Sequence, residues 1–174
     1  MPLYSFEGKS PQIHPSAFVA PTASIVGDVI IEEDASVWYG AVVRADYSQV
    51  IIRKGANVQD GAVIHGPPGE PTEIGEGATV AHNCVVHGAT LGAECLIANG
   101  AIVLDGAKIG AGALIAAGAL VRAGAEIPDG VLAAGIPAQM KGPIAGTSSE
   151  FWVKANPPAY RDLAKRHRDG AAEV

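Results

Sequence analysis

The sequence predicts an all-β fold, a parallel β-solenoid of short strands followed by a C-terminal α-helix. Aliphatic residues recur at every sixth position over most of the 174 residues, glycine occurs 22 times, and aromatic residues make up only 5% of the chain. A repeat of six residues is typical of solenoids, whereas amphipathic helices need a period near 3.6 residues. The length is sufficient for one domain with a sizeable core.

Each repeat supplies one large and one small side chain to the predicted core. Residues two positions apart on a strand point to the same face, so the small residue lies beside the aliphatic one. The large positions are Ile13, Val19, Ile25, Ile31, Val37, Val43, Ile52, Val58, Ile64, Ile74, Val80, Val86, Leu91, Ile97, Val103, Ile109, Ile115, Val121 and Ile127. The small positions are Ala17, Ala23, Ala35, Ala41, Ala56, Ala62, Ala78, Cys84, Ala89, Cys95, Ala101, Ala107, Ala113, Ala119 and Ala125.

Two interruptions of the repeat predict loops. They are RADYSQV, residues 44–50, and HGPPGEPTE, residues 65–73. The rhythm resumes after each of them, at Ile52 and at Ile74, so both loops are expected to leave and re-enter the same stack. Both contain charged or imidazole side chains, which indicates that polar chemistry lies near them.

The repeat ends after Ile127, and the rest of the chain predicts a helical tail. The segment SSEFWVKANPPAYRDLAKRHRDG predicts a helix with Ser148 or Ser149 as its N-cap. Pro157 and Pro158 are expected to divide this helix into two pieces. The chain is therefore expected to consist of a solenoid domain, residues 1–140, and a tail, residues 141–174, that packs on it.

The apolar side of the tail helix is expected to consist of four residues, Phe151, Trp152, Tyr160 and Leu163. This side would lie against the solenoid, where it would also help to shield an open edge of the stack.

Charge and composition exclude several classes of function. The formal charge of −6 argues against a nucleic-acid partner. The sequence has no apolar run of 18 residues and no basic start followed by an apolar core, so we expect a cytoplasmic protein that does not bind a membrane. Cys84 and Cys95 occupy small inward positions, which favours packing in the core over reactivity.

The repeat resembles that of the left-handed parallel β-helix, in which three hexads form one coil of triangular cross-section. The left-handed sense is implied by this resemblance alone, because crossovers between parallel strands are usually right-handed. With three hexads in each coil, residues from successive coils stack in columns about 4.8 Å apart. One column is Arg44, His65, His87 and Leu104. His65 and His87 can therefore converge on one small ion.

His82 belongs to a different column, at another corner of the triangle. That column is Tyr39, Asp60, His82 and Asn99, with Gln59 beside Asp60. The two corners are several strand residues apart, at about 3.3 Å each, so His82 cannot join His65 and His87 within one chain. If three chains associate about a threefold axis, His82 of one chain meets His65 and His87 of the next. Three imidazoles leave zinc an open position for water, so we expect a homotrimer with interfacial metal sites.

Three segments carry a resemblance to the gamma-class carbonic anhydrases and their bacterial relatives. They are VVRADYSQVIIRKGANVQDGAVIHG, TVAHNCVVHGATLG and IVLDGAKIGAGALIAAGALV, and the match spans residues 10–165. The resemblance implies that His65, His82 and His87 are metal ligands and that Gln59 positions the metal-bound water. The implied cofactor is Zn²⁺, and Fe²⁺ and Co²⁺ also suit imidazole ligands.

The resemblance also implies that Arg44, Asp46 and Asp60 form a charged network that supports the trimer interface and the site. These residues could instead be structural ion pairs only. Asn99 could contact the substrate or hydrogen-bond a ligand, although many relatives have Gly-Met at residues 98 and 99. His14 and His167 are expected to be surface or packing residues.

The implied reaction is hydration of carbon dioxide to bicarbonate. A metal ion lowers the pKa of bound water toward about 7, which provides hydroxide at neutral pH. The remaining task is export of a proton, and the acidic loops that perform it in active relatives look short in this chain. Glu70 and Glu73 are the available candidates.

Three other functions remain open at this stage. The metal site could hydrolyse an ester or thioester, or the protein could be a trimeric scaffold of low activity. A coenzyme A acyltransferase would need a groove and one general-base histidine, and it would have no use for three.

Overall fold

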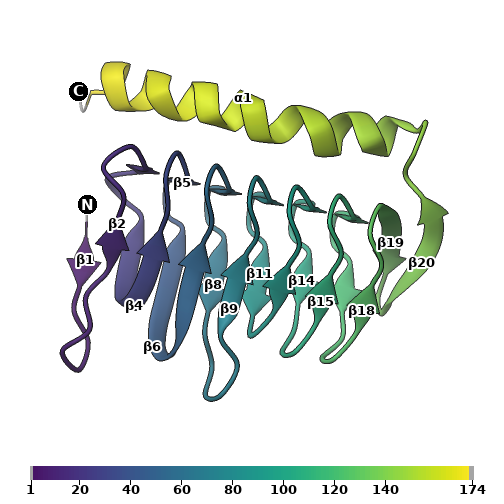
Figure 1. The fold of residues 1–174 in the computed structure, drawn as a ribbon, viewed down its shortest axis with the longest axis horizontal. Helices are drawn as coiled ribbons and strands as arrows, with labels where there is room; N and C mark the ends of the chain where they lie inside the picture. Colours follow the sequence, from purple (N-terminus) through teal and green to yellow (C-terminus); the bar gives the residue numbers. More distant parts are fainter. Residues whose placement is uncertain (1, 173–174) are drawn as a thin grey trace.

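The computed structural model describes residues 2–172, and it is a parallel β-solenoid with one C-terminal helix along its side (Figure 1). Short strands lie on three faces of a prism, and the chain turns a corner between one face and the next. The fold class predicted from the six-residue period is confirmed.

The first face begins at the N-terminus and includes the first parts of two long strands, β4 and β6. Its strands are β1 (Leu3–Tyr4), β4 (Ser24–Ile31), β6 (Val42–Ile52), β8 (Val63–His65), β11 (Val85–His87), β14 (Ile102–Val103) and β17 (Leu120–Val121). The second face contains the later parts of β4 and β6. Its other strands are β2 (Gln12–Ile13), β9 (Thr72–Ile74), β12 (Thr90–Leu91), β15 (Lys108–Ile109) and β18 (Glu126–Ile127).

The third face is a separate sheet that ends in an antiparallel pair. Its strands are β3 (Phe18–Val19), β5 (Ser36–Val37), β7 (Asn57–Val58), β10 (Thr79–Val80), β13 (Leu96–Ile97), β16 (Leu114–Ile115), β19 (Val131–Gly135) and β20 (Ala138–Pro143). The strands from β3 to β19 are parallel, one for each coil of the stack. Strand β20 reverses direction and covers the end of the last coil on this face.

The prediction of a loop at residues 44–50 is wrong, because this segment is part of the continuous strand β6. Gly27 pairs with Ala45 and Val29 pairs with Val50, so β6 carries extra residues between these pairs as it passes from the first face to the second. The sequence looks like a loop here because residues 46–49, which lie between the paired Ala45 and Val50, are polar or aromatic and none of them is buried in the core. The other loop is present: it connects β8 to β9 and extends from the solenoid at residues 66–71 (Figure 1).

The core consists of the repeated aliphatic and small side chains. From Ile25 to Val121, every large position of the repeat is at most 3% exposed. Ile13 and Val19 are only half-buried, because the first coil has a neighbour on one side only. Cys84 and Cys95 are fully buried among the small residues, as the repeat predicts.

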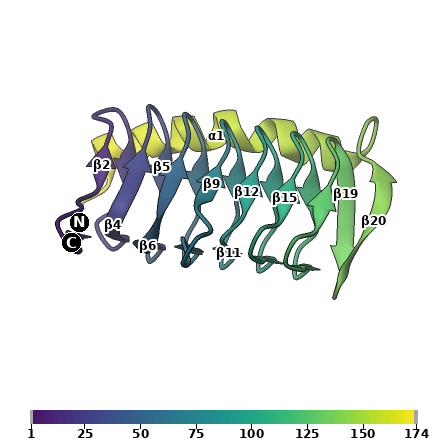
Figure 2. The same cartoon turned by 60° about the horizontal axis from the view of Figure 1, so that its bottom comes forward.

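Helix α1 (Ser148–Gly170) begins beyond β20 and runs back along the third face toward the first coil (Figures 1 and 2). The two ends of the described chain therefore lie at the same end of the stack. Within residues 2–172, no helix is long and apolar enough to cross a lipid bilayer.

The helix differs from the prediction at its start and in its middle. Its N-cap is Thr147, whose hydroxyl accepts a hydrogen bond from the Ser149 N–H, and not Ser148 or Ser149. It is also continuous through Pro157 and Pro158. Proline inside a helix costs about 3 kcal/mol, and the packing of this helix on the solenoid offsets that cost.

The face that the helix buries also differs from the predicted apolar side. Phe151 and Trp152 are 62% and 57% exposed. The buried residues are Val153, Pro157 and Ala164, at helical spacing. Tyr160 and Leu163 lie partly buried against the core, as expected. The expected tail, residues 141–174, is described as far as residue 172.

Two glycines test how closely the coils approach one another. Gly27 and Gly40 both have positive φ, but a Cβ on Gly27 would lie 2.3 Å from the Ala45 carbonyl oxygen, whereas a Cβ on Gly40 would meet nothing within 4 Å. We expect Gly40→Ala to lower the free energy of unfolding by about 1–2 kcal/mol, the cost of the left-handed backbone alone. Gly27→Ala should lower the free energy of unfolding clearly more, because β4 and β6 must also move apart to admit the new Cβ. Urea unfolding at one protein concentration measures both, and equal losses would contradict the close approach.

Candidate metal centre

Two imidazoles from successive coils lie side by side, with their rings tilted by 54°, on the first face of the solenoid. His65 on β8 is the direct strand partner of His87 on β11. Their ring centroids are 4.8 Å apart, and His65 Nδ1 lies 2.9 Å from His87 Nε2. Arg44 on β6 is the strand partner of His65 one coil earlier, so the column expected from the repeat is present.

The outer nitrogen of each ring is bound to a carboxylate. His65 Nε2 lies 2.9 Å from Asp46 Oδ1, and His87 Nδ1 is hydrogen-bonded to Asp105 Oδ1. The Arg44 guanidinium donates to the other oxygen of Asp46. Burial works to raise the pKa of Asp46, but the hydrogen bonds from His65 and Arg44 outweigh it and leave the pKa below its usual value. Asp46 is therefore a carboxylate that accepts from both neighbours.

The inner nitrogens therefore face each other with their lone pairs. A carboxylate can only accept, so each outer nitrogen carries the hydrogen of its ring. A neutral imidazole has one N–H, which leaves His65 Nδ1 and His87 Nε2 as two acceptors 2.9 Å apart. Such a pair repels unless a proton or a metal cation lies between the nitrogens.

The geometry of these two rings suits a metal ion. At zinc–nitrogen bonds of about 2.0–2.1 Å and a tetrahedral angle, two ligand nitrogens are roughly 3.3 Å apart. The pair needs to separate by only a few tenths of an ångström to reach this value. A ligating histidine also usually donates its other N–H to a carboxylate, which fixes the tautomer, and both rings have that partner here. The donor set therefore fits zinc, and equally iron or cobalt.

His82 lies in a separate cluster. Its Nδ1 is 3.1 Å from Asp60 Oδ2, and its Nε2 is 3.4 Å from the Tyr160 hydroxyl of helix α1. Burial, together with the charge of Asp60, raises the pKa of Tyr160. Within residues 2–172 of the single chain, no three His, Cys, Asp or Glu side chains are grouped to hold a metal ion. The third imidazole therefore does not reach the first two inside one chain.

Gln59 and Asn99 lie with His82 and not with His65 and His87. Gln59 is 2% exposed, and its side-chain N–H donates to Asn57 Oδ1 at 2.9 Å. Asn57 in turn donates to the Thr79 hydroxyl, so a buried polar chain supports the amide of Gln59. Asn99 is exposed and follows His82 in the column expected from the repeat.

The two acidic residues of the 65–73 segment have different surroundings. Glu73 accepts a hydrogen bond from Arg53 at 2.7 Å, and the same guanidinium binds Glu32, so Glu73 is committed to an ion pair. Glu70 lies against Gly88, and its Cβ is 3.0 Å from where a Cβ on that glycine would be. Gly88 directly follows His87, so Glu70 is the acidic residue of this loop that lies near the imidazole pair.

Two residues of these clusters, Asp105 and Tyr160, were not predicted from the sequence. Asp105 directly follows Leu104, the next member of the His65 and His87 column. This position beside the column could have predicted the contact of Asp105 with His87. Tyr160 was expected to be an apolar contact only, and its proximity to His82 depends on how the helix docks, which the repeat does not encode.

Neither cysteine can serve as a nucleophile. Burial raises the pKa of the Cys84 thiol to about 11 and that of Cys95 to about 12. Nucleophilic attack requires the thiolate, so both residues are core packing, as the sequence predicts.

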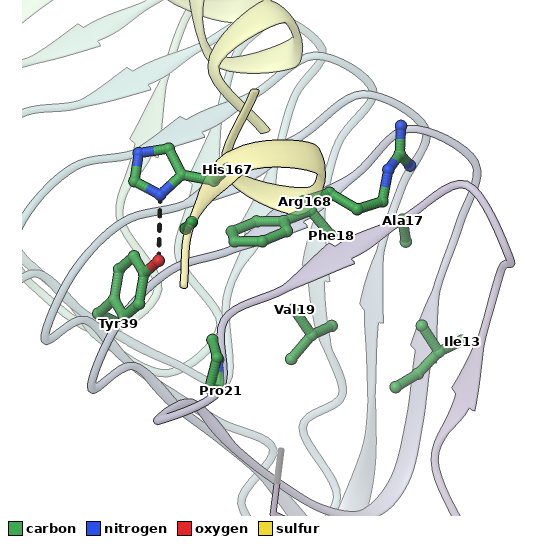
Figure 3. Close-up of a pocket in the computed structure, with 9 residues that line it drawn as sticks. Ile13, Ala17, Phe18, Val19, Pro21, Tyr39, His167 and Arg168 are labelled. Atoms are coloured by element: carbon green, nitrogen blue, oxygen red, sulfur yellow. Dashed lines mark hydrogen bonds between the residues drawn. The ribbon is translucent and has the colours of Figure 1, made fainter. Parts of the chain in front are cut away.

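The remaining histidines are packing and surface residues, as expected. His167 lies among the aromatic rings of Phe18, Trp38 and Tyr39. Its Nδ1 is 3.0 Å from the Tyr39 hydroxyl (Figure 3). A groove opens beside this contact, between the first coil and the end of helix α1. His14 is exposed and lies 2.9 Å from the Ser16 hydroxyl.

Comparison with known proteins gives matches over the whole chain. Residues 88–123 match the family model for the bacterial transferase hexapeptide, described as six repeats. The carnitine operon protein CaiE of Salmonella typhi is 37% identical over 177 residues, covering 100% of this chain and 87% of that protein. The CaiE protein of Escherichia coli O157:H7 is 36% identical, covering 95% of this chain and 84% of that protein.

Two solved structures have the same fold over nearly their full length. A hexapeptide transferase family protein from Anaplasma phagocytophilum is 34% identical, with a TM-score of 0.90, covering 94% of this chain and 96% of the other. A candidate acetyltransferase from Bacillus cereus is 35% identical, with a TM-score of 0.93, covering 96% of each chain.

Asp105 provides a direct test of the imidazole pair. We expect Asp105→Asn to weaken zinc binding by about 10–100-fold, because an amide can no longer hold His87 in the tautomer that presents Nε2. Competition with a chelator on the full chain measures this affinity. Glu126→Gln changes an exposed carboxylate that pairs with Lys108, and it is the matched control that should leave the affinity unchanged. Equal affinities of the two variants would refute the role of Asp105.

Proposed function

Since the chain belongs to the hexapeptide-repeat family that includes the CaiE proteins, we propose that it binds a divalent metal and hydrates carbon dioxide in the manner of the gamma-class carbonic anhydrases. The observation that supports this proposal is the pair of inward-facing lone pairs on His65 and His87, each backed by a carboxylate on the opposite nitrogen. A pair of this kind has no purpose in core packing, and a cation relieves its repulsion.

The third ligand in this proposal is His82 of a neighbouring subunit. Asp60 holds the Nδ1 side of His82, so Nε2, which lies 3.4 Å from the Tyr160 hydroxyl, is the atom that would bind the metal in place of this contact. His82 lies in the column of the third face, and the imidazole pair belongs to the first. Association of three chains about a threefold axis, with different corners in contact, therefore completes three equivalent sites.

A zinc ion bound there would supply a hydroxide nucleophile at neutral pH by lowering the pKa of its water. The protein groups have separate tasks. Asp46 and Asp105 hold the two imidazoles in the binding tautomer, and Arg44 holds Asp46 in place. Gln59, fixed by Asn57, and Asn99 offer amide groups beside His82 that can orient a substrate oxygen.

Proton export falls to Glu70 in this proposal. Glu73 is neutralised by Arg53, whereas Glu70 lies in the 66–71 loop beside Gly88. A carboxylate on an exposed loop can pass a proton to buffer. With one such carboxylate near the site, we expect proton export to limit the rate of hydration.

The direct test is hydration of carbon dioxide by stopped flow. Anaerobically purified protein is loaded with zinc, cobalt or ferrous iron, and we expect metal-dependent hydration by the wild type. His87→Ala should fall to the uncatalysed rate because it removes one ligand. His14→Ala, which changes an exposed histidine outside the clusters, should keep full activity. Absence of hydration with every metal would refute the proposal, and hydrolysis of an acyl-coenzyme A without hydration would favour the hydrolase.

Mixed oligomers test the interfacial position of the site. His65→Ala and His82→Ala chains are expected to bind no metal when each is purified alone. After unfolding and refolding together in equal amounts, about one quarter of the interfaces combine an intact His65 and His87 pair with an intact His82. We therefore expect about one quarter of the wild-type metal content, measured by elemental analysis after gel filtration. Mixed oligomers that bind no metal would place the ligands within one chain.

The descriptions of the two solved relatives favour a second candidate, transfer of an acyl group from a coenzyme A thioester. This reaction needs one general-base histidine and no metal. Acyl transfer that persists in chelator-treated protein and in the His87→Ala variant would support this candidate over the hydratase.

A further inference from the structure

A groove runs beneath helix α1 beside His82, and it is larger than the space that carbon dioxide needs. Its volume is about 350 Å³, within the range of ligand sites in proteins. The solenoid provides its floor, and the roof is formed by Trp152, Asn156 and Tyr160 of the helix. Carbon dioxide has three heavy atoms and would occupy one end of this space.

The floor of the groove follows from the register of the third face. Val58, Val80, Ile97 and Ile115 are successive strand partners, so the residues that follow them form two columns. The first column is Gln59, Ala81, Ala98 and Ala116, and the second is Asp60, His82, Asn99 and Ala117. Alanine replaces the larger side chains in the later coils, which leaves open space under the helix. Three coil spacings give the floor a length of roughly 14 Å.

The groove is polar at one end and apolar at the other. His82, Tyr160 and Gln59 lie at the polar end. At the far end the lining consists of Leu96, Leu114, Ala117 and the exposed indole of Trp152. No Asp, Glu, Lys or Arg is among the residues of the described chain that line it. Asp60 is bound to His82 Nδ1 at 3.1 Å behind the polar end, so an anionic head group would meet a like charge there.

The polar end has hydrogen-bonding capacity to offer a ligand. Gln59 donates one side-chain N–H to Asn57, and Asn156 donates one to the Trp152 carbonyl. An amide has two N–H groups and a carbonyl oxygen, so each of these side chains keeps a donor and an acceptor. The remaining N–H groups can donate to the carbonyl oxygen of an ester or amide, and the side-chain carbonyl oxygens can accept from the N–H of an amide.

We propose that this groove binds an uncharged carbonyl compound with an apolar chain. The chain lies over Ala98 and Ala117 toward Trp152, and the carbonyl lies near Gln59, Tyr160 and His82. The inference rests on the proposed function only in placing the carbonyl beside the metal centre, and binding of the chain does not depend on metal. The site would thus accept substrates or inhibitors larger than carbon dioxide.

Fluorescence of Trp152 tests the occupant directly. Octanamide, octanoate and octylammonium share one chain and differ in the charge of the head group. Titrated into the full-length protein, octanamide should give a saturable change. Octanoate should bind at least about tenfold more weakly, because its carboxylate meets the charge of Asp60. Octylammonium should also bind more weakly than octanamide, because it has no carbonyl oxygen to accept from Gln59. Trp152→Phe should lose the signal, which separates Trp152 from the buried Trp38. No saturable change with octanamide, or equal binding of the three compounds, would overturn the proposal.

Two matched variants test where the chain lies. Ala117→Phe places a ring in the groove from an exposed position and should weaken octanamide binding about tenfold. Ala93→Phe makes the same change at an exposed corner that does not line the groove, and it should bind as the wild type does. Equal affinities of the two variants would show that the compound binds elsewhere, or that a neighbouring subunit fills the groove.

The two proposals can fail separately. The titration is run on chelator-treated and on zinc-loaded protein, and the groove predicts binding in both. In the zinc-loaded protein, octanamide should also inhibit hydration of carbon dioxide. Octanamide binding without any hydration activity would refute the hydratase and support the groove. Hydration without octanamide binding would refute the groove and support the hydratase.

Discussion

The vertical register of the coils determines every other feature of this protein. Each inward aliphatic residue packs directly above its counterpart one coil earlier, as Val86 does above Ile64 and below Val103. A shift of one residue would turn the core side chains outward, so the buried rows hold the register firmly. Because the core fixes the register, it also fixes the columns of polar side chains on the outside.

The polar chemistry follows from these columns. Two histidines that are 22 residues apart in sequence become neighbours because both follow a core position in successive coils of one face. The same register separates His82 from them, since its core position belongs to another face. Each chain therefore presents a pair of imidazoles on one face and a third imidazole on another, and the carboxylates of Asp46 and Asp105 orient the pair in a way that the strands alone do not.

The sequence was sufficient for the features that depend on period and register. The solenoid, its core and the pairing of Arg44, His65 and His87 all follow from counting in sixes. The left-handed sense is implied by the family resemblance, not by the period, and stays a prediction. Residues 44–50 were misread because a strand that passes a corner has no complete hexad, and its polar outward residues look like a loop. The helix was misread at Pro157 because tertiary packing outweighs the local cost of proline, and Asp105 and Tyr160 needed side-chain geometry that a repeat cannot supply.

The path of helix α1 changes how the stack holds together. In an open solenoid each coil touches only the coils beside it, so the ends can fray while the middle stays intact. Here one continuous helix leaves the last coil and contacts strands as early as β3, so it connects the two ends of the stack. Loss of a terminal coil would remove part of the surface on which the helix packs, and detachment of the end of the helix would expose the Phe18 and Trp38 rings beneath it. The helix thus links coils that do not touch one another, and we expect these coils to unfold together more than those of an open solenoid do.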